Sequence, residues 1–153
     1  MTIKAITVLG CAVLMSAASL ADAPMVSECK CACKCKCQKP VDKGIEKAVG
    51  YYIEGGRKGD SKITRKAFAQ WATMSWLENG KLTTVPIQAL YEYVDKSGAQ
   101  TVTHGEIKVC AKTDTTAVVS VDTQFGDAKY TDMFALVRDG NDWKIVAKVY
   151  HVK

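Results

Sequence analysis

Five cysteines occupy every second position in the stretch SECKCACKCKCQKP, which runs from Ser27 to Pro40. In an extended segment, alternate residues point the same way, so these thiols would share one side of the chain. Zinc is held by four thiolates, and copper(I) needs fewer. Lysines between the thiols favour the thiolate form and offset its negative charge. One interpretation is therefore a site for Zn or Cu(I), with these candidate ligands: Cys29, Cys31, Cys33, Cys35 and Cys37.

Two other interpretations of the same segment stay open. Neighbouring cysteines can close strained disulfides in an oxidising compartment. Five is an odd number, so one thiol would remain to pair with Cys110 or with another chain. The segment could also be a linker with neither chemistry. The spacing alone does not decide among metal binding, disulfide formation and a plain linker.

The start of the sequence predicts export. Lys4 precedes an apolar stretch that ends in small residues at Ala21 to Ala23, which is the layout of a secretory signal peptide. We expect residues 1–23 to be removed by cleavage after Ala21 or Ala23, leaving a mature chain with no membrane span. A periplasmic or secreted location follows, where disulfides can persist.

The composition changes abruptly near Pro40 and divides the mature chain into two parts. Residues 24–40 form a tail rich in cysteine and lysine, and residues 41–153 read as one globular domain. Most of the surplus of 21 basic over 16 acidic residues comes from the tail lysines. The domain itself is nearly neutral, so we exclude nucleic acid as a partner.

Helices come first in the domain. Apolar residues from Val41 to Tyr52 follow a helical spacing, and Gly55 and Gly56 are expected to end that helix. A second helix is predicted from Asp60 or Ser61 as far as Trp71. A third helix is expected after Pro86, and it should bury Ile87, Leu90, Tyr91 and Val94 before Gly98 ends it.

Strands dominate the remainder. Asn79 and Gly80 predict a tight hairpin turn between two short alternating runs. Four longer strands are predicted near residues 102–112, 116–125, 128–138 and 143–152, and their short connections imply antiparallel neighbours. The last two strands have no purely polar face, so both sides of the sheet need cover. We expect a homodimer, with Met133, Val137, Val146 and Tyr150 on the paired face.

Three stretches of the domain resemble the lumazine-binding-like branch of the nuclear-transport-factor-2-like superfamily. They read AVGYYIEGGRKGDSKITRKAF, ENGKLTTVPIQALYEYV and KYTDMFALVRDGNDWKIVAKVYH. The resemblance covers nearly all of residues 41–153 and implies an α+β cone, in which N-terminal helices pack on the concave face of a curved antiparallel sheet. It also implies a pocket at the open end of the cone, dimerisation through the outer face of the sheet, and a small hydrophobic ligand.

Chemistry in such a pocket would need a positioned acid or base. By strand alternation, His151 and Asp132 could each face inward, and both are candidates for catalysis and for ligand binding. Tyr52 and Tyr91 are the candidate hydrogen-bond donors from the helices. His104 and Glu106 are further candidates for catalysis, and Trp71, Trp76 and Trp143 are expected in the core.

The favoured interpretation is an exported, non-catalytic domain that binds a small molecule or mediates assembly, with the cysteine-rich tail serving metal or thiol chemistry. The alternative is an enzyme of the isomerase or dehydratase type that uses an acid or base in the cone pocket. Fold alone does not separate the two, because this superfamily supports both.

Overall fold

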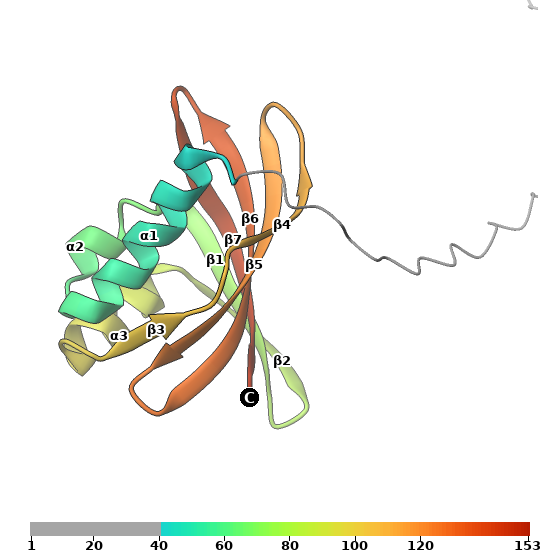
Figure 1. The fold of residues 1–153 in the computed structure, drawn as a ribbon. Helices are drawn as coiled ribbons and strands as arrows, with labels where there is room; N and C mark the ends of the chain where they lie inside the picture. Colours follow the sequence, from blue (N-terminus) through green and yellow to red (C-terminus); the bar gives the residue numbers. More distant parts are fainter. Residues whose placement is uncertain (1–40) are drawn as a thin grey trace, which may run out of the picture. The chain divides into compact units, whose positions relative to one another are not determined.

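The computed structural model describes residues 41–153, and the expected signal peptide and the cysteine-rich tail lie outside them. Figure 1 shows three helices gathered on one side of a curved sheet. The helices are α1 (Lys43–Lys58), α2 (Ser61–Thr64) and α3 (Gln88–Ser97). The strands are β1 (Phe68–Glu78), β2 (Lys81–Pro86), β3 (Val102–His104), β4 (Lys108–Lys112), β5 (Thr116–Phe125), β6 (Ala128–Asp139) and β7 (Asp142–Val152). Within this part of the chain, no helix is both long and apolar enough to span a membrane.

The seven strands form one sheet in the order β2-β1-β7-β6-β5-β3, and β4 also pairs with β5. The predicted α+β class, with helices packed on one face of a curved sheet, is confirmed. Strand β1 lies beside β7 in parallel orientation, and every other pair among the described strands is antiparallel. The first and last long strands therefore meet at the centre of the sheet. The alternation of apolar and polar residues in the sequence did not reveal this parallel pair.

Helix α1 runs one turn further than the sequence predicted. Gly55 and Gly56 lie inside the helix, and Gly59 ends it in the left-handed conformation at φ 61°. These two glycines do not end the helix; they allow it to pack closely against its neighbours. A Cβ on Gly55 would lie 2.0 Å from Thr64 Oγ1, and one on Gly56 would lie 2.3 Å from the ring of Phe125.

The expected second helix is wrong beyond its first turn. Only α2 is helical, and from Phe68 onward the chain is the strand β1. Trp71 is 80% exposed on that strand and does not belong to the core. Backbone pairing with β7 overrides the helical spacing here, because a long strand gains a ladder of hydrogen bonds from a neighbour distant in sequence.

Three other sequence predictions are confirmed. Asn79 and Gly80 both have positive φ, at 50° and 77°, and they connect β1 to β2 as a tight turn. Helix α3 buries Leu90, Tyr91 and Val94 and ends at Gly98. The strand predicted over residues 102–112 is present as β3 and β4, and both pieces pair with β5.

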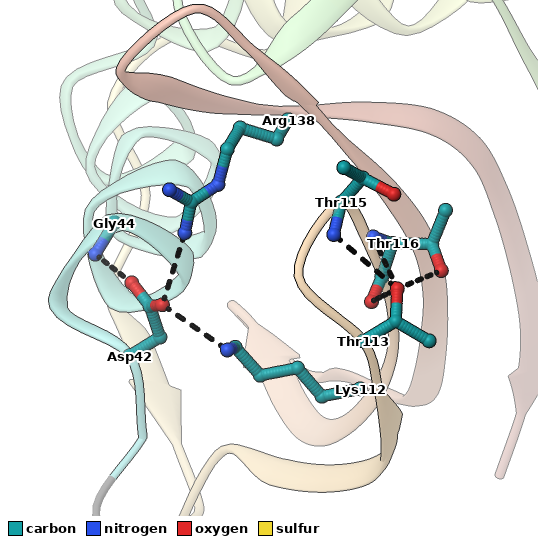
Figure 2. A network of polar contacts seen from close by, with 7 residues as sticks. All are labelled: Asp42, Gly44, Lys112, Thr113, Thr115, Thr116 and Arg138. Atoms are coloured by element: carbon teal, nitrogen blue, oxygen red, sulfur yellow. Dashed lines mark hydrogen bonds and ion pairs between the residues drawn. The ribbon is translucent and has the colours of Figure 1, made fainter.

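A polar network fixes the beginning of α1 to the sheet (Figure 2). The carboxylate of Asp42 accepts a hydrogen bond of 2.9 Å from the backbone N–H of Gly44 and so caps the helix. The same carboxylate lies 3.5 Å from Lys112 Nζ on β4 and 3.7 Å from the Arg138 guanidinium on β6. The hydrogen bond from Gly44, together with the two cations, lowers the pKa of Asp42. These contacts of Asp42 hold the N-terminal end of α1 next to β4 and β6.

We predict opposite effects for two alanine substitutions on α1. Gly55→Ala forces its new methyl group against the backbone and side chain of Thr64, and should lower the free energy of unfolding by about 1–3 kcal/mol. Gly50→Ala is the matched control: a Cβ there meets nothing within 4 Å, so stability should rise by about 0.5–1 kcal/mol. Urea unfolding of both variants measures the difference. Equal effects at the two positions would contradict the close contact between α1 and α2.

Candidate functional site

A cavity of about 330 Å³ opens between the helices α1 and α3 and the inner face of the sheet. Its wall is mostly aromatic and aliphatic, and Lys148 is the only charged side chain among the described residues that line it. The lining residues are Tyr52, Gly56, Met74, Trp76, Ala89, Leu90, Tyr93, Val94, Gly98, Gln100, Phe125, Tyr130, Lys148 and Tyr150. A largely apolar cavity with a few polar groups is the usual form of a small-molecule site.

An irregularity in β7 decides which side chains reach this cavity. Leu136 on β6 pairs with Ile145, whereas Ala135 pairs with Ala147, so Val146 is an extra residue in the ladder. Such a bulge reverses the alternation beyond it. Ile145 before the bulge and Lys148 after it are therefore both buried on the inner face.

The bulge also explains why one sequence prediction is wrong. Alternation counted from Trp143 placed His151 on the inner face, but His151 is exposed and lies outside the cavity. Tyr150, expected on the outer face, lines the cavity instead and stacks on Trp76 with ring centroids 5.5 Å apart. Because of this one inserted residue, Lys148 and Tyr150 line the cavity and His151 does not.

Lys148 belongs to a buried polar cluster centred on Asp132. Asp132 is fully buried on β6, and its Oδ1 accepts a hydrogen bond of 2.5 Å from Lys148 Nζ. Its Oδ2 accepts hydrogen bonds of 3.0 Å from the Tyr52 hydroxyl and 2.6 Å from Thr123 Oγ1. Both carboxylate oxygens are thus occupied, and among the described residues no buried side-chain nitrogen or oxygen lacks a partner.

Burial controls the protonation of this cluster. It lowers the pKa of Lys148, because desolvation of the ammonium group outweighs the opposing attraction of Asp132. Burial, reinforced by the negative charge of Asp132, holds the pKa of Tyr52 well above its usual range. Burial likewise raises the pKa of Tyr150 to about 12. Both tyrosines therefore remain neutral hydrogen-bond donors at neutral pH.

The arrangement combines a proton donor and a proton acceptor at one end of an apolar cavity. The Lys148 ammonium can donate a hydrogen bond to an oxygen of a bound molecule, and Asp132 can take up the proton that Lys148 gives away. Aromatic faces assist the positive charge: Lys148 Nζ lies 4.0 Å from the ring centroid of Tyr150 and 5.5 Å from that of Tyr52. The geometry suits a planar molecule that carries a carbonyl or carboxylate oxygen.

The remaining candidate residues are scattered. Tyr91 is buried beside the cavity without lining it, and the Arg65 guanidinium lies 4.1 Å above its ring. His104 and Glu106 are exposed. Of the tryptophans other than Trp71, Trp143 is in the core and Trp76 lines the cavity.

The proposed metal ligands Cys29, Cys31, Cys33, Cys35 and Cys37 lie outside the described residues. Within residues 41–153, no three His, Cys, Asp or Glu side chains are grouped as a metal site. The only cysteine in that range is Cys110, which is exposed on β4.

Lys148 is the residue that sequence reasoning missed. It stands in the apolar run WKIVAKVY, where simple alternation assigns it to the solvent side. A lysine within so apolar a strand was the only available signal. It is a weak one, since a solvent-facing lysine and a buried lysine paired with a carboxylate look the same in sequence. Asp132 on the neighbouring strand was singled out, but without its partner.

We predict that breaking the buried ion pair is costly from either side. Asp132→Asn should lower the free energy of unfolding by about 3–5 kcal/mol, because it would leave the buried Lys148 ammonium without a compensating negative charge. Lys148→Met should cost a similar amount by leaving the carboxylate without its cation. The double variant should lose less than the sum of the two, and Lys144→Met on the same strand should change stability by less than about 0.5 kcal/mol. Additive losses would contradict direct coupling.

The pH dependence of the difference between wild type and Lys148→Met gives a second measurement. Because burial lowers the pKa of Lys148 below 10.5, the unfolded state binds more protons than the folded state in the window between the two values. Stability from this lysine should therefore rise with pH across that window. The raised pKa values of Tyr52 and Tyr150 make the stability fall as the pH rises above 10. Both tyrosines are present in the wild type and in the variant, so this contribution is removed when the two proteins are compared. Denaturant unfolding at several pH values would reveal the difference, and a flat difference would contradict it.

Comparisons with known proteins agree with the fold. The family described as "Putative lumazine-binding" matches residues 40–151. Aldolase FrzH from Cladobotryum sp is 28% identical over 102 residues, which cover 65% of this chain and 82% of that protein.

Solved structures give the same result. An NTF2-like protein of unknown function from Shewanella baltica OS155 is 31% identical, with a TM-score of 0.64 over 72% of this chain and 92% of the other. An NTF2-like protein of unknown function from Methylobacillus flagellatus KT is 25% identical, with a TM-score of 0.63 over 76% and 96%. The resemblance seen in the sequence is confirmed: the chain belongs to the lumazine-binding-like family of the NTF2-like superfamily.

Proposed function

We propose that the domain binds a small, planar and mostly apolar molecule in the cavity between α1, α3 and the sheet, with an oxygen of that molecule facing Lys148. The observation that carries this proposal is the position of Lys148: it is the one charged group among the described cavity-lining residues, and it is 3% exposed. A single charged group in an otherwise apolar wall offers a bound molecule one fixed polar contact, which sets the orientation of that molecule.

The shape and chemistry of the cavity support a planar ligand. Trp76 and Tyr150 lie nearly parallel, at an interplanar angle of 23°, and present aromatic surface to the cavity. The volume of about 330 Å³ suits a molecule of one or two fused rings. The family description names lumazine, a planar bicyclic molecule with ring carbonyl groups, which matches these requirements in size, in planarity and in the oxygen that it can offer to Lys148.

Lumazine is therefore the probe of choice. We expect it to bind the full chain at one molecule per chain, detected by the change in its own fluorescence or by calorimetry. Ala89→Trp should weaken binding at least tenfold, since Ala89 is half-buried on α3 and lines the cavity, so a large side chain there would take up space that the ligand needs. Glu92→Trp, exposed on α3 but outside the cavity, is the matched control. Absence of binding, or equal effects of the two variants, would overturn the proposal.

A second candidate function is acid–base catalysis in the same cavity. Asp132 and Lys148 form a proton-transfer pair, and the hydroxyl of Tyr52 donates to the same carboxylate. The relative named as an aldolase lends support, because aldol chemistry moves protons next to a carbonyl group. If the protein is an isomerase or dehydratase, as the alternative interpretation of the sequence has it, then Asp132 and Lys148 would be its acid and base, and His151 would take no part.

We also propose that two copies pair through the outer face of the sheet. Val118, Met133, Val137 and Val149 on β5, β6 and β7 are each 39–44% exposed, which is unusual for neighbouring apolar side chains on a sheet. Light scattering on the full chain should give twice the mass of one chain. A single-chain mass at high concentration would contradict pairing.

The export signal and the cysteine-rich tail remain proposals from the sequence. We expect protein isolated from its native host to lack the first 21 or 23 residues, to reside in an oxidising compartment, and to carry thiol or soft-metal chemistry on residues 24–40. Intact mass measures the cleavage, and counting free thiols separates the chemistries. One or no free thiol favours disulfides, whereas five or six after metal removal favours Zn or Cu(I). A protein that retains Met1 would contradict export.

A further inference from the structure

We infer that Lys148 is a nucleophile that condenses with the carbonyl group of a bound aldehyde or ketone and holds it as an imine. This inference rests on the proposed function, because the carbonyl compound must first occupy the cavity. It names the class of ligand, a planar aromatic or conjugated carbonyl compound, and assigns that ligand a covalent bond to this chain.

The placement of Lys148 meets the requirements of an amine nucleophile. Its side chain lines the cavity and is otherwise enclosed, so a ligand in the cavity can reach the amine while bulk water is largely excluded. Burial lowers the pKa of Lys148, which increases the share of the neutral, nucleophilic amine at neutral pH. Asp132 Oδ1, 2.5 Å from Nζ, is in position to accept the proton that the ammonium must lose.

The step balances with the groups present. Lys148 Nζ gives a proton to Asp132, and its lone pair then adds to the carbonyl carbon while the carbonyl oxygen takes that proton from Asp132. The new C–N bond leaves nitrogen positively charged, and nitrogen returns a proton to Asp132. Asp132 next protonates the hydroxyl group, the C–O bond breaks, and water leaves as the nitrogen lone pair forms the C=N bond. The products are one water molecule and a protonated imine beside the Asp132 carboxylate.

The surroundings favour the charged product. Before and after the step, one positive charge lies beside one carboxylate, so no net charge is created in the apolar site. The rings of Tyr150 and Tyr52 face the nitrogen from 4.0 Å and 5.5 Å and stabilise a cation there. Tyr52 and Thr123 hold Asp132 Oδ2, which leaves Oδ1 free to exchange protons with the lysine.

Cinnamaldehyde, a planar aromatic aldehyde, is the test probe. The full chain is incubated with it and with sodium cyanoborohydride, which reduces any imine to a stable amine, and the modified residues are located by peptide mass spectrometry. We expect one adduct per chain at Lys148, formed at least roughly tenfold faster than at Lys144 on the same strand, because Asp132 serves as acid and base. Lumazine should slow labelling at Lys148 and leave labelling at Lys144 unchanged.

Two variants separate a nucleophile from a merely structural lysine. Lys148→Arg keeps a cation beside Asp132 but cannot form an imine, so it should lose the fast labelling phase. Asp132→Asn keeps the lysine but removes its proton acceptor, so labelling of Lys148 should slow to the rate of Lys144. Circular dichroism confirms that each variant is folded. Equal labelling rates at Lys148 and Lys144 in the wild type would overturn the inference even if lumazine binds, whereas failure of lumazine to bind would overturn the proposed function itself.

Discussion

The ion pair between Asp132 and Lys148 is the constraint on which the rest of the domain depends. Two charges are buried between a helix and a sheet, and their desolvation is tolerated only because each has a partner. The carboxylate also receives hydrogen bonds from Tyr52 on α1 and Thr123 on β5. One buried group therefore joins β5, β6, β7 and the first helix. A shift of any of these elements would leave a charge or a hydroxyl group without its partner.

Helix α1 is held in place by this constraint. Small residues let the helix approach its neighbours, with Gly55 against Thr64 and Gly56 against the ring of Phe125. The ring of Tyr52 packs edge-on against Phe68, Phe125 and Phe134 before its hydroxyl reaches the carboxylate. Close packing sets the distance of the helix from the sheet, and the hydrogen bond sets its register. The cavity lies between this helix, α3 and the inner face of the sheet.

Much of the fold was predictable because it follows from local pattern. Helical spacing located α1 and α3, the Asn79–Gly80 pair located the hairpin, and alternation located the long strands. Features that depend on distant partners were not predictable. The apolar residues from Ile63 to Trp71 fit a helix as well as a strand, and only the pairing of β1 with β7 decides between them.

The candidate site was half predictable for the same reason. Asp132 and Tyr52 were identified, and the structure joins them through a hydrogen bond of 3.0 Å. The bulge at Val146 has no signature in the sequence, because valine and alanine suit either face of a strand. That single inserted residue gave the inner face to Lys148 instead of His151. Only the pairing register of β6 and β7 decides whether Lys148 or His151 reaches the cavity.

The central position of β7 has a consequence for the order in which the domain can assemble. This strand is synthesised after all the others, yet it lies between β1 and β6 and carries the lysine of the site. Until it is inserted, β1 and β2 form a separate hairpin, the carboxylate of Asp132 has no cation, and the apolar edges of two half-sheets are open. Pairing of β1 with β7 closes a long loop of chain, which slows folding and leaves strand edges unpaired until that pairing forms. A nascent chain would keep these edges exposed until β7 is available.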